Sequence, residues 1–110
     1  MIVSQDGNIS IFTQENATIV ELVKKIESLY QKHKNDNFIV SLSTFNPLST
    51  QDILEFLELS NIHRAKKHSF VIVSDKLNFD EIPDEIVVVP TAQEAYDIIE
   101  MEEMERDLDF

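Results

Sequence analysis

The run SFVIV, Ser69–Val73, decides the fold of this chain. Its last four residues are all apolar, so a strand formed by them needs cover on both faces. Two similar runs occur on either side of it, FIV at 38–40 and IVVV at 86–89. Continuous apolar runs of this kind are typical of central strands in a parallel sheet, because half-exposed strands alternate apolar and polar residues. The sequence therefore predicts a largely parallel sheet.

Amphipathic segments separate these strands and predict helices at 18–34, 49–65 and 92–108. The first and last of them begin at capping boxes, which are formed by Thr18 with Glu21 and by Thr91 with Glu94. The buried stripe expected for the middle helix consists of Ile53, Leu54, Phe56, Leu57 and Ile62.

The N-terminal segment Ile2–Phe12 predicts a hairpin with Asp6-Gly7 as its two-residue turn. Pro83 interrupts the acidic connection 74–85 and leaves room for only a short helical turn there. The expected order is hairpin, helix, strand, helix, strand, strand, helix, which indicates a single α/β domain over residues 1–110.

The chain carries 9 Lys and Arg against 21 Asp and Glu, a net charge of −12. Such a charge repels phosphate backbones, so nucleic-acid binding is not expected. The absence of cysteine excludes thiol catalysis and disulfides, and a single glycine excludes a glycine-rich phosphate loop. We expect no cofactor and no metal. The opening residues lack the pattern of a signal peptide and no apolar segment is long enough to cross a membrane, so a cytoplasmic protein is expected.

Two adjacent hydroxyl residues, Ser49 and Thr50, stand where the middle helix begins. With Ser49 as N-cap, Asp52 completes a capping box, and Leu48 and Ile53 form a hydrophobic staple. Helix initiation alone explains this pattern. The alternative is a phospho-acceptor at Ser49 or Thr50, or a partner surface at this end of the helix, because exposed amides at a helix N-terminus attract phosphate. Its members would be Asn46, Pro47 and Asp52.

The segment HRAKKH, His63–His68, is the one basic cluster, with Arg64, Lys66 and Lys67 at its centre. Cations at this position would satisfy the dipole and last carbonyls of the middle helix. The alternative is a docking patch for an acidic partner, or for the acidic tail of another copy. Its two histidines lack a third ligand at defined spacing, so a metal site is not expected there.

Apolar residues continue at helical spacing through the acidic C-terminal segment: Ile98, Met101, Met104 and Leu108. This segment is expected to pack and fray on its own domain or to bind another protein through its methionines.

The run from Phe38 to Glu100 resembles a STAS domain, the family that includes anti-sigma factor antagonists. The resemblance is carried by the strand FIVSLS, the hydroxyl residues LST at a helix start, the strand SFVIV, and EIVVVPTAQEA near the end. It implies a STAS-like mixed, mostly parallel sheet with an N-terminal hairpin, helices mainly on one face and an acidic helical tail at about 100–110. Because apolar strands need both faces covered, either the tail or a partner is expected to cover the other face.

In function, the STAS resemblance implies a non-catalytic protein–protein interaction and regulatory module. Ser49 or Thr50 takes the position of the family's phospho-acceptor. Phosphorylatable members carry Asp just before that residue and a small residue soon after it, whereas Leu48 precedes Ser49 here and Gln51 and Asp52 follow. We therefore expect a module without a working phospho-switch.

A narrower resemblance, through FLELSNIHR, IPDEIVVVPT and EAYDIIEMEEMERDL, is to small acidic proteins that are often labelled ribonuclease Z. It implies, as the alternative, a ribonuclease or an accessory to that nuclease. The chemistry of such a nuclease needs a histidine and aspartate cluster that binds two metals. None of the three histidines, His33, His63 and His68, lies in such a run.

Overall fold

The computed structural model describes residues 1–15, 17–42, 48–75 and 79–108. In chain order its elements are β1 (Ile2–Asp6), β2 (Ile9–Thr13), α1 (Ile19–His33), β3 (Asn37–Ser41), α2 (Thr50–Leu54), α3 (Leu57–Ala65), β4 (Phe70–Val73), the 3₁₀ turn η1 (Phe79–Glu81), β5 (Val87–Val89) and α4 (Ala92–Leu108). The five strands form one sheet in the order β1-β2-β3-β4-β5. β1 is antiparallel to β2, and the other neighbouring pairs are parallel. The predicted α/β class and mixed sheet are confirmed.

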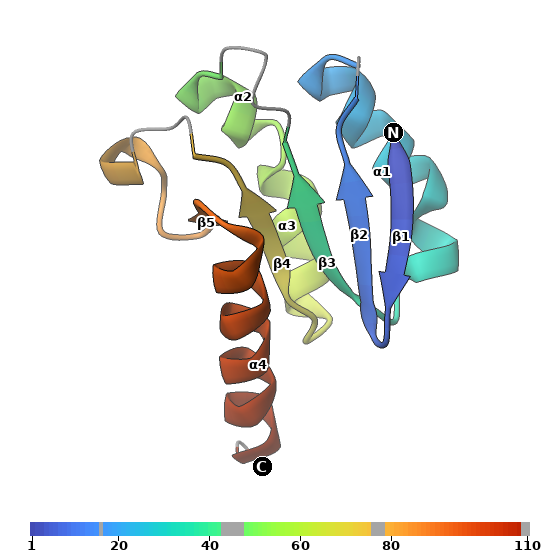
Figure 1. The fold of residues 1–110 in the computed structure, drawn as a ribbon, viewed down its shortest axis with the longest axis vertical. Helices are drawn as coiled ribbons and strands as arrows, with labels where there is room; N and C mark the ends of the chain where they lie inside the picture. Colours follow the sequence, from blue (N-terminus) through green and yellow to red (C-terminus); the bar gives the residue numbers. More distant parts are fainter. Residues whose placement is uncertain (16, 43–47, 76–78, 109–110) are drawn as a thin grey trace.

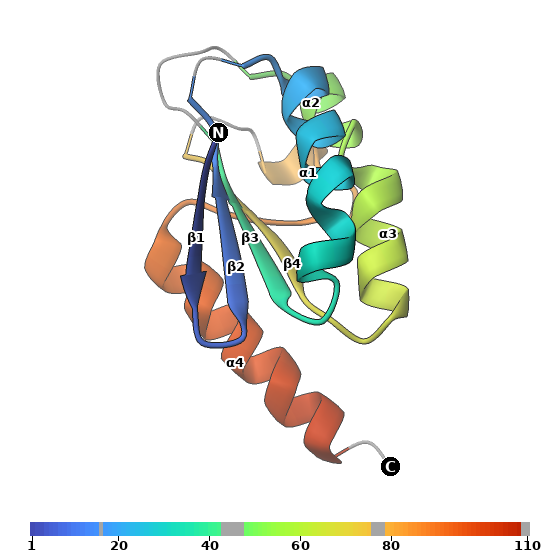
Figure 2. The same cartoon turned by 90° about the vertical axis from the view of Figure 1, so that its right-hand side faces the viewer.

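Helices lie on both faces of this sheet (Figure 1). From β2 to β3 and from β3 to β4, the chain moves to the adjacent strand on the same side. Because crossovers between parallel strands are right-handed, the helices in these two connections lie on one face of the sheet. Seen edge-on, the sheet separates α1, α2 and α3 from α4 (Figure 2). The tail helix thus covers part of the face that the three other helices leave open.

The strands bury alternate residues in two clusters. The cluster under α1 to α3 takes its strand residues from Phe12, Phe38, Val40, Phe70 and Ile72. The cluster under α4 joins Ala95 and Ile99 to strand residues Ile9, Ile39, Val71 and Val89. Successive side chains of a strand thus enter different clusters, one on each face of the sheet. Burial on both faces is the cause inferred from the sequence for the continuous apolar runs.

The middle helix is not continuous, and this corrects the prediction for 49–65. The amides of Glu55 and Phe56 donate to carbonyls three residues earlier, which is the tighter 3₁₀ pattern. In that geometry residues three apart lie one above the other, and Ile53 and Phe56 are both fully buried. The break changes the phase of α3, so that Leu59 and His63 are buried while Ile62, predicted to be core, is 44% exposed.

The hairpin turn lies one residue later than predicted. Asp6 pairs with Ile9, so Gly7 and Asn8 are the central turn residues. Gly7 has φ of +58°, a value that glycine adopts without strain, and glycine at the first central position is typical of hairpin turns.

β1 forms an open edge of the sheet, and all five of its residues are exposed. α4 packs mainly over β3, β4 and β5, so on the face that α4 covers, the hairpin strands β1 and β2 have no helix over them (Figure 1). None of the described helices has both the length and the apolar character needed to span a membrane.

Candidate functional site

The start of α2 is built as the sequence predicts. Ser49 Oγ accepts a hydrogen bond from the Asp52 amide at 3.3 Å, and Asp52 Oδ2 accepts one from the Ser49 amide at 3.0 Å. Ile53 is fully buried and Leu48 packs against the same core. The capping box is therefore confirmed, and it engages the Ser49 hydroxyl in the helix cap.

Thr50 contacts an acid from another element. Its Oγ1 donates to Glu81 Oε2 of η1 at 3.1 Å. A phosphate on Thr50 would lie beside that carboxylate and repel it. Phosphorylation of Ser49 or Thr50, the alternative considered above, stays a hypothesis. Asn46 and Pro47, expected on the same surface, lie outside the described residues.

The first histidine of the basic cluster is a core residue, which corrects its expected place among the capping cations of the helix. His63 is fully buried and stacks on Phe38 with ring centroids 3.9 Å apart. Its Nε2 lies 2.7 Å from the carbonyl oxygen of Asp36, which can only accept, so Nε2 carries the proton. Its Nδ1 then accepts from the hydroxyl of Tyr30 at 2.7 Å.

Burial is the main reason that the pKa of His63 is lowered from its ordinary value to about 4. The side chain is thus neutral at physiological pH and adds no charge to the cluster. Its spacing of seven residues from Phe56 and four from Leu59 is the sequence signal that places it on the buried side of α3.

Ser10, His33 and Asp36 also lie together, although no sequence pattern groups them. Ser10 Oγ lies 3.0 Å from His33 Nδ1 and 2.9 Å from Asp36 Oδ2. In a catalytic triad the acid orients the histidine, whereas here both residues contact the serine, which is fully buried. The group joins β2 to the turn after α1.

One residue of the basic cluster, Arg64, pairs with the chain's own C-terminal helix. Arg64 Nη2 forms an ion pair with Glu102 Oε2 of α4 at 3.1 Å. Arg106 of α4 donates from Nη1 to Ser69 Oγ at 3.2 Å. Lys66 lies over the ring of Tyr30, 4.8 Å from its centroid. The acidic tail of another copy was one alternative partner for this patch, and within one molecule the tail helix already contacts the patch at Arg64.

Lys67 ends α3 in an unusual conformation. It has φ of +67°, and its amide and that of His68 donate to the carbonyls of Arg64 and His63. These two bonds define a Schellman motif, whose left-handed residue is usually glycine because a Cβ atom is strained there. Lys67 holds that position with a strained backbone.

Replacing Lys67 with glycine should raise the free energy of unfolding by about 0.5–1 kcal/mol, because the Cβ strain is removed. Urea denaturation of both proteins would measure the change. Lys66→Gly is the matched control, since Lys66 has φ of −87° and glycine there should destabilise. A Lys67→Gly protein no more stable than Lys66→Gly would contradict the expectation.

α4 is apolar on two opposite sides. Its inner side buries Ala95 and Ile99 on the sheet. Its outer side carries Met101, Met104 and Leu108, which are 55%, 59% and 77% exposed. The last turns of α4 extend beyond the ends of the strands (Figures 1 and 2). The predicted stripe is therefore mostly turned away from the domain.

A groove of about 370 Å³ runs between α4 and the hairpin end of the sheet. Its apolar lining is Ile9, Tyr96, Ile99 and Met104, and its acidic lining is Glu100, Glu103 and Asp107. Two hydrogen bonds hold its walls together, from Tyr96 Oη to Asp6 Oδ2 at 3.0 Å and from Asn8 Nδ2 to Glu103 Oε2 at 2.9 Å. The groove combines apolar surface with negative charge.

Within the ranges that the structure describes, no three His, Cys, Asp or Glu side chains come together to bind a metal ion. In comparisons with known proteins, no family model matches the chain and no curated protein matches its sequence.

Proposed function

We propose that this chain is a non-catalytic protein–protein interaction and regulatory module, similar to an anti-sigma factor antagonist, and that α4 is its main contact element. The observation that carries the proposal is the exposed strip of Met101, Met104 and Leu108 on a helix whose other side is already packed. A helix with one apolar side needs only its own domain, whereas a second apolar side is explained by a partner.

The geometry of the strip supports helix-in-groove recognition. Its residues are three and four apart, so they lie along one line of the helix. A helix that is recognised in this way inserts such anchors into an apolar groove of its partner. Methionine side chains adapt their shape to the surface that they meet, which suits regulatory binding.

The charge around the strip defines the partner. Glu100, Glu103 and Asp107 line the adjoining groove, and the whole chain has a net charge of −12. Complementary charge speeds association and selects among partners. The partner is therefore a protein with an apolar groove or segment bordered by lysine and arginine.

The proposal predicts that the double variant Met101→Ser/Met104→Ser captures the partner about tenfold less well than the wild type, because two central apolar anchors are removed. Affinity capture from the native cell with quantitative mass spectrometry would measure this. The matched control is Val20→Ser/Ile62→Ser, which removes two apolar side chains that are 46% and 44% exposed on other helices.

Three results would count against the proposal: a partner captured equally by the methionine variant, a partner lost equally with the control, or no partner at all. The amount of partner captured should also fall when the salt concentration is raised from about 0.05 to about 0.5 M. Over roughly this range, salt screens the attraction between exposed charges. Binding that does not change with salt would contradict the proposal that this acidic surface binds a basic partner.

A further inference from the structure

The hairpin has apolar residues on an open face. The residue pairs on that face are Ile2 with Thr13, Ser4 with Ile11 and Asp6 with Ile9, because directly opposed residues of antiparallel strands point the same way. It is the face that α4 covers elsewhere, since Ile9 and Ile11 pack in the cluster under α4. Ile2 is 52% exposed on this face. A sheet face that stays in water normally alternates toward polar residues, so these isoleucines indicate a surface that something covers.

The open surface has the size of one helix. Neighbouring strands lie about 4.8 Å apart, so two strands are about 10 Å wide, which is close to the diameter of a helix and to the distance between packed helices. A strand of five residues spans about 17 Å, which about 11 residues of helix also span. The groove of about 370 Å³ runs along α4 at this place. A single helix beside α4 would therefore complete the layer.

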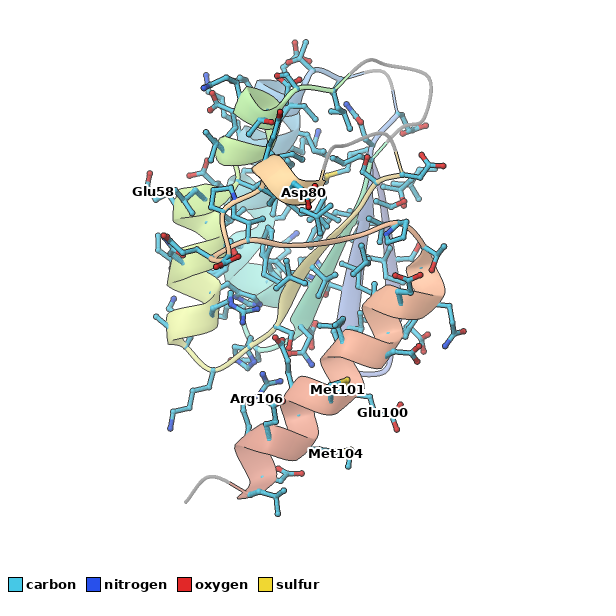
Figure 3. All side chains as sticks on the ribbon, turned by 90° about the vertical axis from the view of Figure 1, so that its left-hand side faces the viewer. Glu58, Asp80, Glu100, Met101, Met104 and Arg106 are labelled. Carbon is cyan, nitrogen blue, oxygen red and sulfur yellow. The ribbon has the colours of Figure 1, made fainter. Side chains whose placement is uncertain are left out.

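The acids that line the groove form a row along α4. Glu100, Glu103 and Asp107 are three and four residues apart, so they share one side of the helix, and we call them the acidic row. Glu100 and Met104 lie on the side of α4 away from Arg106 and from the end of α3 (Figure 3). Among the described residues that line the groove, none is a lysine, an arginine or a histidine. The complementary ligand has an apolar stripe with a row of positive charges beside it.

Two hydrogen bonds fix the walls of the groove. Tyr96 Oη of α4 donates to Asp6 Oδ2 of β1 at 3.0 Å, and Asn8 Nδ2 of the hairpin turn donates to Glu103 Oε2 at 2.9 Å. They join α4 to the hairpin at two points, so the groove exists before anything binds to it. A preformed groove lowers the entropy that is lost when a helix docks.

The charge of the chain argues against a second copy as the occupant. The apolar strip on α4 of a second copy would bring its own acidic row into the groove, and each copy has a net charge of −12. Like charges that face each other across an interface oppose binding. The groove therefore selects a basic helix from a different protein.

We propose that a partner protein lays an amphipathic helix in this groove, beside α4 and over the hairpin. The apolar stripe of that helix contacts Ile9, Ile11 and Met104. Its lysines or arginines, three and four residues apart, face the acidic row. This inference rests on the proposed function, because it specifies the partner segment that α4 contacts. It adds one point that can be tested separately, which is that the sheet face of the hairpin belongs to the contact.

The first test uses three fluorescent synthetic peptides of about 14 residues, each titrated with the whole chain at about 0.15 M salt and followed by fluorescence anisotropy. The first peptide has leucines at helical spacing and lysines elsewhere. The second has glutamate in place of each lysine, and the third is a scrambled form of the first without an apolar stripe. The leucine–lysine peptide should bind saturably, one per chain. The scrambled peptide should bind about tenfold more weakly, and the glutamate peptide should show no saturable binding.

Adjacent residues of β1 supply a matched pair of variants. Ser4 pairs with Ile11 and faces the α4 side, whereas Val3 pairs with Phe12 and faces the side of α1. Ser4→Arg places a long cation where the helix docks and should weaken binding of the leucine–lysine peptide about tenfold. Val3→Arg makes the same change of charge on the other face and should alter binding by less than about twofold.

A second pair of variants tests the acidic row and does not depend on the hairpin. Glu100→Lys/Asp107→Lys should weaken binding of the leucine–lysine peptide about tenfold. The control Glu27→Lys/Glu58→Lys changes the net charge equally, at exposed residues of α1 and α3 on the other side of the sheet (Figures 2 and 3). It should weaken binding by less than about threefold, because its charges are distant from the groove.

The inference is overturned if the leucine–lysine peptide does not saturate, if the scrambled peptide binds equally well, or if the two variants of either pair behave alike. A dimer in sedimentation velocity that Ser4→Arg abolishes would also overturn it, since a second copy would then occupy the groove. Capture of the native partner separates this inference from the proposed function. A partner lost with Met101→Ser/Met104→Ser but kept by Ser4→Arg would refute the helix over the hairpin alone, whereas a partner kept by the methionine variant refutes the proposed function.

Discussion

Replacing Ile99 with alanine should lower the free energy of unfolding by about 2–4 kcal/mol, the range for a large apolar side chain deleted from a packed core. Ile99 is 1% exposed and lies where α4 packs on Ile9, Ile39 and Val71 of the sheet. The surrounding core relaxes only partly after such a truncation, so a cavity remains and adds to the loss. Urea denaturation followed by far-UV circular dichroism would measure the loss.

The matched control is Met101→Ala, only two residues further along the same helix. Met101 is 55% exposed, so its truncation should change the stability by less than about 0.5 kcal/mol. Equal effects of the two substitutions would show that α4 does not pack on the sheet by the side described above. The same pair separates stability from partner binding, since Met101 is expected to matter for binding alone.

Acidification from pH 7 to pH 5 should lower the free energy of unfolding by about 2 kcal/mol through His63 alone. The folded pKa of about 4 lies below the ordinary value of 6.5, so the unfolded chain binds the proton more readily between these values. The stabilisation that neutral His63 gives to the folded state is fully present above pH 6.5 and is lost as the pH falls toward 4. His68, whose pKa is also lowered, acts in the same direction. Urea midpoints at a series of pH values would measure the slope.

Tyr30→Phe tests the origin of this slope. Without the Tyr30 hydroxyl, the neutral ring of His63 loses its donor at Nδ1. The folded pKa of His63 should then rise and the stability should depend less steeply on pH. Tyr96→Phe is the control, because Tyr96 bonds Asp6 at the surface and not a histidine. Equal stability at pH 5 and pH 7 in the wild type would refute the assignment of His63 as a neutral core residue.

Local sequence patterns predicted the strands and the helix start well. The run at 70–73 needed cover on both faces, and Ser49 with Asp52 formed the expected capping box. Both features depend on neighbouring residues, whose spacing can be seen in the sequence alone. The same holds for the mixed sheet, because a tight hairpin and long helical connections leave few other arrangements.

The remaining features depend on contacts between distant residues. His63 is satisfied by Tyr30 and by the carbonyl of Asp36, which lie 33 and 27 residues away in the sequence. The residues next to His63 in the sequence do not predict these partners. Likewise, α4 has apolar residues on two sides, and only its packing on the sheet shows that Ile99 is inner and Met104 is outer.

The order of the strands has a consequence for how the chain folds. Each strand pairs with the one next to it in sequence, so the sheet can grow one strand at a time. The bonds from α4 behave differently, since those that join it to Asp6, Asn8 and Asn37 span 90, 95 and 69 residues. Because loop closure over such lengths costs entropy before any contact is gained, α4 should dock last. The apolar face that α4 covers would then stay in contact with water until this last step.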